Sequence, residues 1–233
     1  MMNEIEAIYF DDDILVINKP SGVLSVADGY KQDMPHLRSL LEPEFGCLWM
    51  VHRLDKESSG VMVLARNAHA HKFLNEQFRE RLVKKTYHAL VSPCPKWQSQ
   101  HVEFPLAVNT GRKHLTRVDF VKGKSAYSNF KVLKISSPFC LLECTITTGY
   151  RHQIRAHLYH LGIGILGDTL YCPPQNPFPA NTFARMMLHA SQIDFFHPGK
   201  KSIVSFSAQT PTIFFDLLEK TIPTNLDTDV SMT

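Results

Sequence analysis

Short apolar runs separated by polar turns recur along the chain and predict a strand-rich fold. Two such runs, residues 5–10 and 13–18, flank the acidic turn Asp11-Asp12-Asp13 and indicate a β-hairpin. The Val-Met-Val-Leu run within residues 60–65 indicates a buried strand. Further strands are predicted over residues 86–92, 116–121, 125–135, 141–147 and 202–207.

Helical patterns are fewer. The longest covers about residues 68–82, where Asn67 can cap the first turn and apolar side chains recur at helical spacing. A second helix is predicted from Arg151 to Leu161, with Gly162 as a natural C-terminal cap. Shorter helices are predicted over residues 35–42 and from Thr210-Pro211 to about Lys220.

Roughly eight strands with few helices between them do not form a regular βαβ alternation. The pattern predicts an α+β fold with a large, mainly antiparallel sheet. GxGxxG and GxxxxGK[ST] motifs are both absent from the sequence, which argues against a nucleotide cofactor. We expect one domain over residues 1–222 and a polar, disordered tail over residues 223–233.

The composition is that of a soluble globular protein, with 44% hydrophobic and 20% charged residues. No apolar run approaches the roughly 20 residues that span a bilayer, and the N-terminus does not resemble a signal peptide. We therefore expect a cytoplasmic protein. The five cysteines form no CxxC pair and the histidines show no zinc-ligand spacing, so reduced thiols and no metal site are expected.

The charge distribution permits a polyanionic ligand. The net charge is +3, and the basic residues cluster within residues 79–85, 112–124 and 151–155. A single cluster is usually a solvated face, whereas three beside polar, reactive side chains favour a polyanionic ligand, and RNA is permitted but not required.

The loop His52-Arg53-Leu54-Asp55-Lys56-Glu57-Ser58-Ser59-Gly60 is dense in functional groups and precedes a buried strand. Asp55 lies between Arg53 and Lys56, and a nearby cation keeps a carboxylate ionised. An ionised, fixed carboxylate can act as a nucleophile or a general base. The alternative is a salt-bridged turn at the start of a strand.

A second segment, residues 148–157, reads TGYRHQIRAH. In a helix Arg151 and Arg155 would lie on one face, where two guanidinium groups could hold a phosphate or a carboxylate. The alternative is a basic stripe at the edge of the core.

A third segment, residues 84–91, reads KKTYHALV. Tyr87 begins a strand beside two lysines, and a tyrosine ring can stack on a base while its hydroxyl donates. The alternative is an ordinary core aromatic.

Together these segments resemble the RluA-type family of pseudouridine synthases. The family loop HRLDxxTSG appears as HRLDKESSG, with Ser58 in place of Thr, and its basic segment TGRxHQ[IL]RxH appears with Tyr150 in place of Arg. Weaker blocks follow in the family's order: NKPSGVLS at 18–25, FPL at 104–106, GKSAYSNFKV at 123–132, GDTLY at 167–171 and MLHASQIDFFHP at 187–198. The resemblance spans almost the whole chain.

The resemblance implies the pseudouridine synthase catalytic fold, with an active-site cleft across the sheet. It implies isomerisation of specific uridines in structured RNA, either transfer RNA or ribosomal RNA, without a cofactor. Asp55 would be the essential carboxylate, Arg155 its ion-pair partner, and Tyr87 the ring that stacks on the uracil. The residues expected to bind the substrate are Arg53, His52, Arg151, Lys85 and Gln153.

The first predicted strand begins near Ile5, so we expect a short family form without an N-terminal accessory RNA-binding domain, acting as a monomer. One alternative is a non-catalytic RNA-binding or ribosome-assembly protein on the same fold, although binding alone does not need Asp55. Another is a nucleoside or glycoside hydrolase. Most glycosidases use two carboxylates, and Glu57 is the only near neighbour of Asp55 in sequence.

Overall fold

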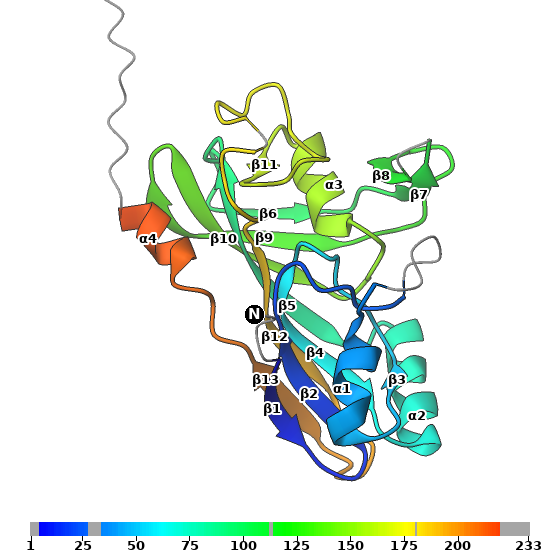
Figure 1. The fold of residues 1–233 in the computed structure, drawn as a ribbon. Helices are drawn as coiled ribbons and strands as arrows, with labels where there is room; N and C mark the ends of the chain where they lie inside the picture. Colours follow the sequence, from blue (N-terminus) through cyan, green and yellow to red (C-terminus); the bar gives the residue numbers. More distant parts are fainter. Residues whose placement is uncertain (1–4, 28–33, 112–113, 180, 220–233) are drawn as a thin grey trace, which may run out of the picture.

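The computed structural model describes residues 5–27, 34–111, 114–179 and 181–219, and one large sheet runs through them (Figure 1). In spatial order its strands are β1 (Glu6–Phe10), β2 (Ile14–Lys19), β4 (Ser59–Ala65), β12 (Leu188–Phe196), β5 (Lys84–Ser92), β10 (Phe139–Ile146), β9 (Ser128–Ser136) and β6 (Ser99–Val102). Shorter strands extend it: β3 (Trp49–Met50) pairs with β4, β11 (Gly164–Ile165) with β5, and β13 (Ile203–Ser207) with β12.

The pairing is antiparallel throughout this sheet except between β4 and β12, which run parallel. A separate hairpin of β7 (Leu106–Thr110) and β8 (Leu115–Val118) lies next to a helix, α3 (Gln153–His160). The predicted α+β fold with a large, mainly antiparallel mixed sheet is confirmed.

The other helices cover the sheet. They are α1 (Leu37–Phe45), α2 (Ala68–Arg79) and α4 (Ile213–Glu219). α2 begins where the sequence predicts, because the Asn67 side chain accepts the Ala70 N–H at 2.8 Å and satisfies an otherwise unpaired donor. α2 packs against β4 and β12, while α4 packs against β9 and β10. None of the described helices is long and apolar enough to span a membrane.

The sequence reading missed the central strand β12, although it found its neighbours. His189, Gln192 and Asp194 interrupt the apolar pattern of this strand. They are accommodated by tertiary contacts, as when the buried His189 Nδ1 lies 2.8 Å from Ser59 Oγ on β4. The predicted end of the last helix and the tail at residues 223–233 lie outside the described residues.

The parallel contact between β4 and β12 depends on Gly60. This residue has a φ of +118° and pairs with Ala190. A Cβ at Gly60 would overlap the backbone carbonyl oxygen of Ala190. The glycine therefore allows β12 to approach the strand that follows the Asp55 loop.

We expect Gly60→Ala to lower the free energy of unfolding by at least about 3 kcal/mol, the combined cost of a strained φ and a backbone clash. Gly46→Ala is the matched control, because Gly46 also has a positive φ, +73°, but has nothing within 4 Å of the added Cβ. Its cost should be the backbone strain alone, about 1 to 3 kcal/mol, and smaller than that of Gly60→Ala. Urea denaturation of both variants measures the difference, and equal losses would contradict the clash.

Candidate active site

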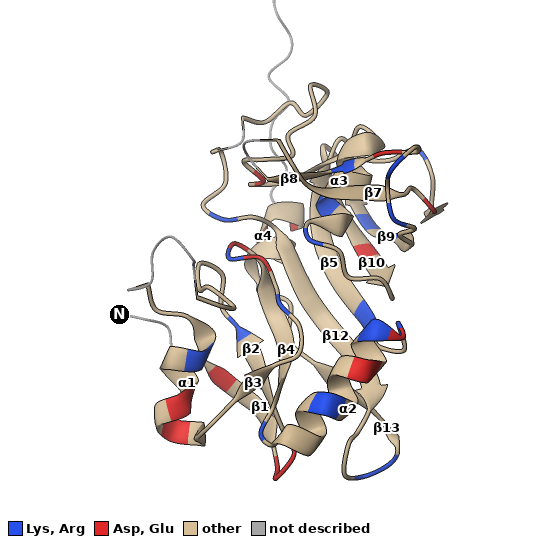
Figure 2. Ribbon diagram, turned by 90° about the vertical axis from the view of Figure 1, so that its right-hand side faces the viewer, with Lys and Arg blue, Asp and Glu red and all other residues tan. Residues whose placement is uncertain are grey.

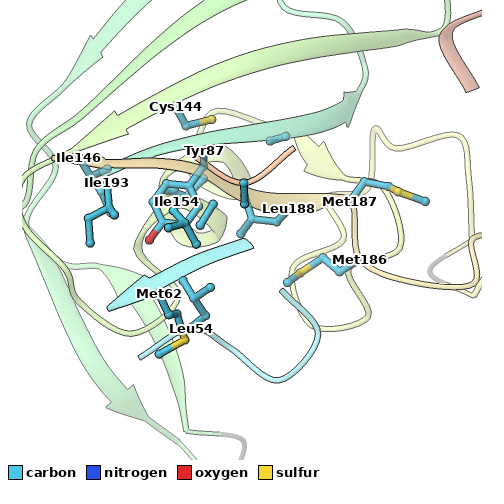
Figure 3. Close-up of a cluster of buried hydrophobic side chains, with 14 of the residues drawn as sticks. Leu54, Met62, Tyr87, Cys144, Ile146, Ile154, Met186, Met187, Leu188 and Ile193 are labelled. Atoms are coloured by element: carbon cyan, nitrogen blue, oxygen red, sulfur yellow. The ribbon is translucent and has the colours of Figure 1, made fainter. Parts of the chain in front are cut away.

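A cavity of about 470 Å³ lies between the loop that precedes β4 and the start of α3. In Figure 2 this loop, with basic and acidic positions, lies below α3, whose one Lys or Arg position is Arg155. The apolar part of the cavity wall includes Leu54, Ile146, Ile154 and Leu188, which Figure 3 shows around Tyr87. All eight predicted site residues line this one cavity: His52, Arg53, Asp55, Lys85, Tyr87, Arg151, Gln153 and Arg155.

Asp55 and Arg155 form an ion pair at the cavity, although they are 100 residues apart in the chain. Arg155 Nη1 donates to Asp55 Oδ2 at 2.9 Å. The Arg155 side chain is 3% exposed and that of Asp55 16% exposed. The carboxylate is thus partly open to the cavity, while the cation that pairs with it is buried behind it.

A second carboxylate, Asp168, fixes the orientation of Arg155. Arg155 Nε and Nη2 donate to its two oxygens at 2.7 and 2.8 Å. Asp168 has a fully buried side chain, and its Oδ1 also accepts the N–H groups of Leu170 and Tyr171. Burial opposes the positive charge, but hydrogen bonds and charge from Asp168 and Asp55 raise the pKa of Arg155. Arg155 is therefore a fixed cation with Nη1 directed at Asp55.

The sequence reading gave Asp168 no role, although it matched the GDTLY block. The nearby Tyr171 was also missed, and its ring lies 4.9 Å from the Arg155 guanidinium carbon. An aspartate followed by backbone donors two and three residues later is an ordinary turn signal. Only the folded chain shows that this turn encloses a guanidinium group.

The predicted helix from Arg151 is wrong at its start. His152 has a left-handed conformation (φ 56°, ψ 22°), so α3 begins only at Gln153. Arg151 and Arg155 therefore do not share a helical face. Arg151 is exposed, and its Nη1 donates to Asn109 Oδ1 at 3.0 Å. Gly162, with a φ of +75°, does follow the end of α3 as predicted.

The left-handed turn brings His152 to the site. Its Nε2 lies 3.7 Å from Asp55 Oδ1, and its Nδ1 lies 3.0 Å from the Tyr171 hydroxyl oxygen. Burial lowers the pKa of His152 to about 4, although the charge of Asp55 opposes the shift. The ring is therefore neutral near pH 7, and Arg155 supplies the positive charge beside Asp55.

Tyr87 presents its ring to the cavity from β5. Burial, followed by the negative charge of Asp55, raises the pKa of the phenol. The phenol is thus protonated at neutral pH and can donate a hydrogen bond or stack against a planar group.

Two buried side chains, Lys19 and Ser25, hold the backbone of the Asp55 loop. The buried Lys19 Nζ donates to the carbonyl oxygens of Lys56 at 3.2 Å and Ser58 at 2.8 Å. Ser25 Oγ accepts the Leu54 N–H at 3.1 Å and donates to the Leu54 carbonyl at 2.7 Å. These contacts preorganise the backbone on both sides of Asp55.

The predicted substrate-binding residues differ in how many of their hydrogen-bonding groups are free to contact a substrate. His52 Nε2 accepts the Val63 N–H at 3.0 Å, and its ring stacks on Phe78. Burial, then the charge of Lys85, lowers the pKa of His52 to about 3. Gln153 also hydrogen-bonds within the protein. Its Nε2 donates to Thr148 Oγ1 and other groups, and its Oε1 accepts a backbone N–H. Arg53 is exposed at the cavity.

The geometry agrees with the comparison to known proteins. The family model described as RNA pseudouridylate synthase matches residues 13–160, which include Asp55, Tyr87 and Arg155. The chain belongs to this family.

Relatives of the family match nearly the whole chain. The dual-specificity RNA pseudouridine synthase RluA of Pasteurella multocida is 36% identical over 88% of this chain and 92% of its own length. The ribosomal large subunit pseudouridine synthase C of Buchnera aphidicola is 34% identical over 92% of this chain and 70% of its own. The solved structure of human RNA pseudouridylate synthase domain containing 1 has a TM-score of 0.76 and 25% identity, covering 91% of this chain and 85% of that one. The expected pseudouridine synthase fold and isomerase class are confirmed.

Proposed function

We propose that this family member isomerises specific uridines to pseudouridine in structured RNA, with transfer RNA or ribosomal RNA as substrate. The observation that carries the proposal is the partly open Asp55 carboxylate held by the buried Arg155 in a cavity that Tyr87 lines. The names of the relatives, one dual-specificity enzyme and one ribosomal enzyme, support the substrate class.

The reaction breaks the bond from the ribose to a ring nitrogen and forms one to a ring carbon, so it involves no redox change. Asp55 is proposed to attack the substrate or to remove a proton, with Arg155 as its ion-pair partner. Tyr87 is proposed to stack on the uracil. Its raised pKa makes a phenolate base at neutral pH unfavourable. A uridine within a stem must leave the base stack to reach this cavity.

The structure does not favour a hydrolase that uses two carboxylates. Glu57 is exposed and is not among the described residues that line the cavity. Asp168 is fully buried and binds Arg155 and two backbone N–H groups, so it cannot act as a general acid. Asp55 is left as the single reactive carboxylate that the described part of the chain presents to the cavity.

The test is to incubate the protein with unmodified transfer RNA and ribosomal RNA transcripts, digest them to nucleosides and separate the products by chromatography. Pseudouridine supports the proposal and shows which RNA class to map. Free uracil would indicate a hydrolase instead. Tight binding without any product would indicate a non-catalytic RNA-binding protein.

Lys85 is proposed to bind a substrate phosphate through its ammonium group. Burial lowers its pKa to about 8, and two of its N–H donors go to the carbonyls of Thr147 and Thr148. The cation is present below that pH and lost above it. We therefore expect KM for RNA to rise from about pH 7 to about pH 9.

Lys85→Gln should remove this rise, whereas Lys84→Gln, which changes the exposed neighbouring lysine, should retain it. Initial rates at several pH values measure the effect. A flat KM profile in the unchanged protein would contradict phosphate binding by Lys85.

We propose that residues 1–222 form one catalytic domain that acts as a cytoplasmic monomer. Light scattering of the purified chain, with and without RNA, measures its oligomeric state.

A further inference from the structure

A cluster of exposed rings and lysines lies at the C-terminal end of α3. Phe120 and Val121 are 67% and 89% exposed, and neither lines the active-site cavity. The Phe120 ring centroid lies 5.8 Å from that of Phe104 and 6.0 Å from that of His160. The aromatic-basic patch comprises these residues and two exposed lysines: Phe104, Phe120, Val121, Lys122, Lys124 and His160.

The turn that carries this patch is rigid. Asp119 Oδ1 accepts the N–H groups of Val121 and Lys122, both at 2.9 Å. Leu106 and Lys124 exchange two backbone hydrogen bonds, each of 2.9 Å, which close the turn. The backbone of this turn therefore holds Phe120 and Val121 in solvent, and the exposed Lys122 and Lys124 belong to the same turn.

Among the described residues, neither Lys122 nor Lys124 forms an ion pair with an acid. The carboxylate of Asp119 is engaged by backbone N–H groups, which lower its pKa. Glu103, the other nearby acid in sequence, accepts from His101 Nε2 at 2.8 Å. Exposed rings beside free cations are the combination that binds single-stranded nucleic acid, since bases stack on rings and phosphates attract lysines. Charged residues are depleted from the cores of protein interfaces, so a protein partner fits this patch less well.

We propose that the aromatic-basic patch binds an unpaired nucleotide of the substrate RNA outside the catalytic cavity. The base stacks on Phe120, and the adjoining phosphates contact Lys122 and Lys124. α3 links the two sites, since a rise of about 1.5 Å per residue puts His160 roughly 8 Å beyond Arg155 along its axis. An RNA with its target uridine in the cavity can therefore reach the patch. The inference rests on the proposed function, because it requires an RNA substrate.

The first test places a fluorescent reporter in the patch. Phe120→Trp adds an exposed indole to a chain that already contains Trp49 and Trp97. Stacking of a base on the new ring should quench its emission when RNA is added, beyond the change seen in the unchanged protein. No additional quenching at saturating RNA would overturn the proposal.

The second test compares binding and turnover. Phe120→Ala should raise both Kd and KM for the RNA about tenfold and leave kcat unchanged, because Phe120 touches no reacting group. Lys122→Gln with Lys124→Gln should reduce the salt dependence of Kd. The matched controls are Ile203→Ala, on the exposed face of β13, and Lys72→Gln, on α2, and neither should change Kd.

The outcomes separate the inference from the proposed function. If the wild-type protein forms no pseudouridine from any RNA, the proposed function is wrong. If the wild-type protein is active and Phe120→Ala has the same Kd and KM, only the inference about the aromatic-basic patch is wrong. A loss of self-association in Phe120→Ala, seen by light scattering, would assign the patch to a second copy of the chain and also overturn the inference.

Discussion

Replacing Asp55 by Asn is expected to stop pseudouridine formation and to leave RNA binding in place. The amide keeps the size and one acceptor oxygen for Arg155 Nη1, so the site should keep its shape. It can neither attack the substrate nor accept a proton at neutral pH. We expect turnover to fall by at least about a thousandfold, the range typical of a lost acid–base or nucleophilic group.

Glu57→Gln is the matched control for this variant. It removes the other carboxylate of the same loop, which is exposed and does not line the cavity. Single-turnover assays should show normal activity for Glu57→Gln and none for Asp55→Asn, with similar Kd values from filter binding. Activity in Asp55→Asn would mean that another group carries the reaction. A loss of activity in Glu57→Gln would support a mechanism with two carboxylates.

Removing Arg155 is expected to damage both catalysis and stability. Arg155→Ala leaves Asp55 without its counter-ion and leaves the fully buried charge of Asp168 without a partner. An uncompensated buried charge costs about 3 to 5 kcal/mol of folding free energy. Turnover should fall by at least about a hundredfold, which corresponds to about 3 kcal/mol of lost transition-state stabilisation.

A double variant separates these two effects. Asp168→Asn in the Arg155→Ala background removes the unpaired buried charge, so the double variant should be more stable than Arg155→Ala alone. Its turnover should stay as low as that of Arg155→Ala, because Asp168 acts on Asp55 only through Arg155. Urea denaturation and single-turnover rates measure the two quantities. Restored turnover in the double variant would show that Arg155→Ala is impaired only by instability.

Local features of this protein could be predicted from its sequence where neighbouring residues decide the structure. The first hairpin forms because the acidic turn lies between two apolar runs, and Asp11 Oδ1 accepts the backbone N–H groups of Asp13 and Ile14. The start of α2 is fixed by Asn67 within its own first turn. The HRLDKESSG segment marked Asp55 as the candidate carboxylate, since its functional groups are contiguous.

The arrangement around Asp55 was decided only by the tertiary structure. Its contact with Arg155 joins residues 100 positions apart, and the contact of Arg155 with Asp168 adds a partner from a third segment. The left-handed backbone at His152 likewise overrides the apparent helical spacing of Arg151 and Arg155.

The physical reason for this division is the range of the forces involved. Caps and turns are satisfied within a few residues, so their signals are contiguous in sequence. Burying Asp168 requires a cation and backbone donors that only the packed chain brings together. Burial at the centre of the sheet likewise makes a strand of β12 despite its polar residues. The sequence alone thus determined the fold class and the candidate catalytic carboxylate, whereas the tertiary structure decided which groups hold that carboxylate in place.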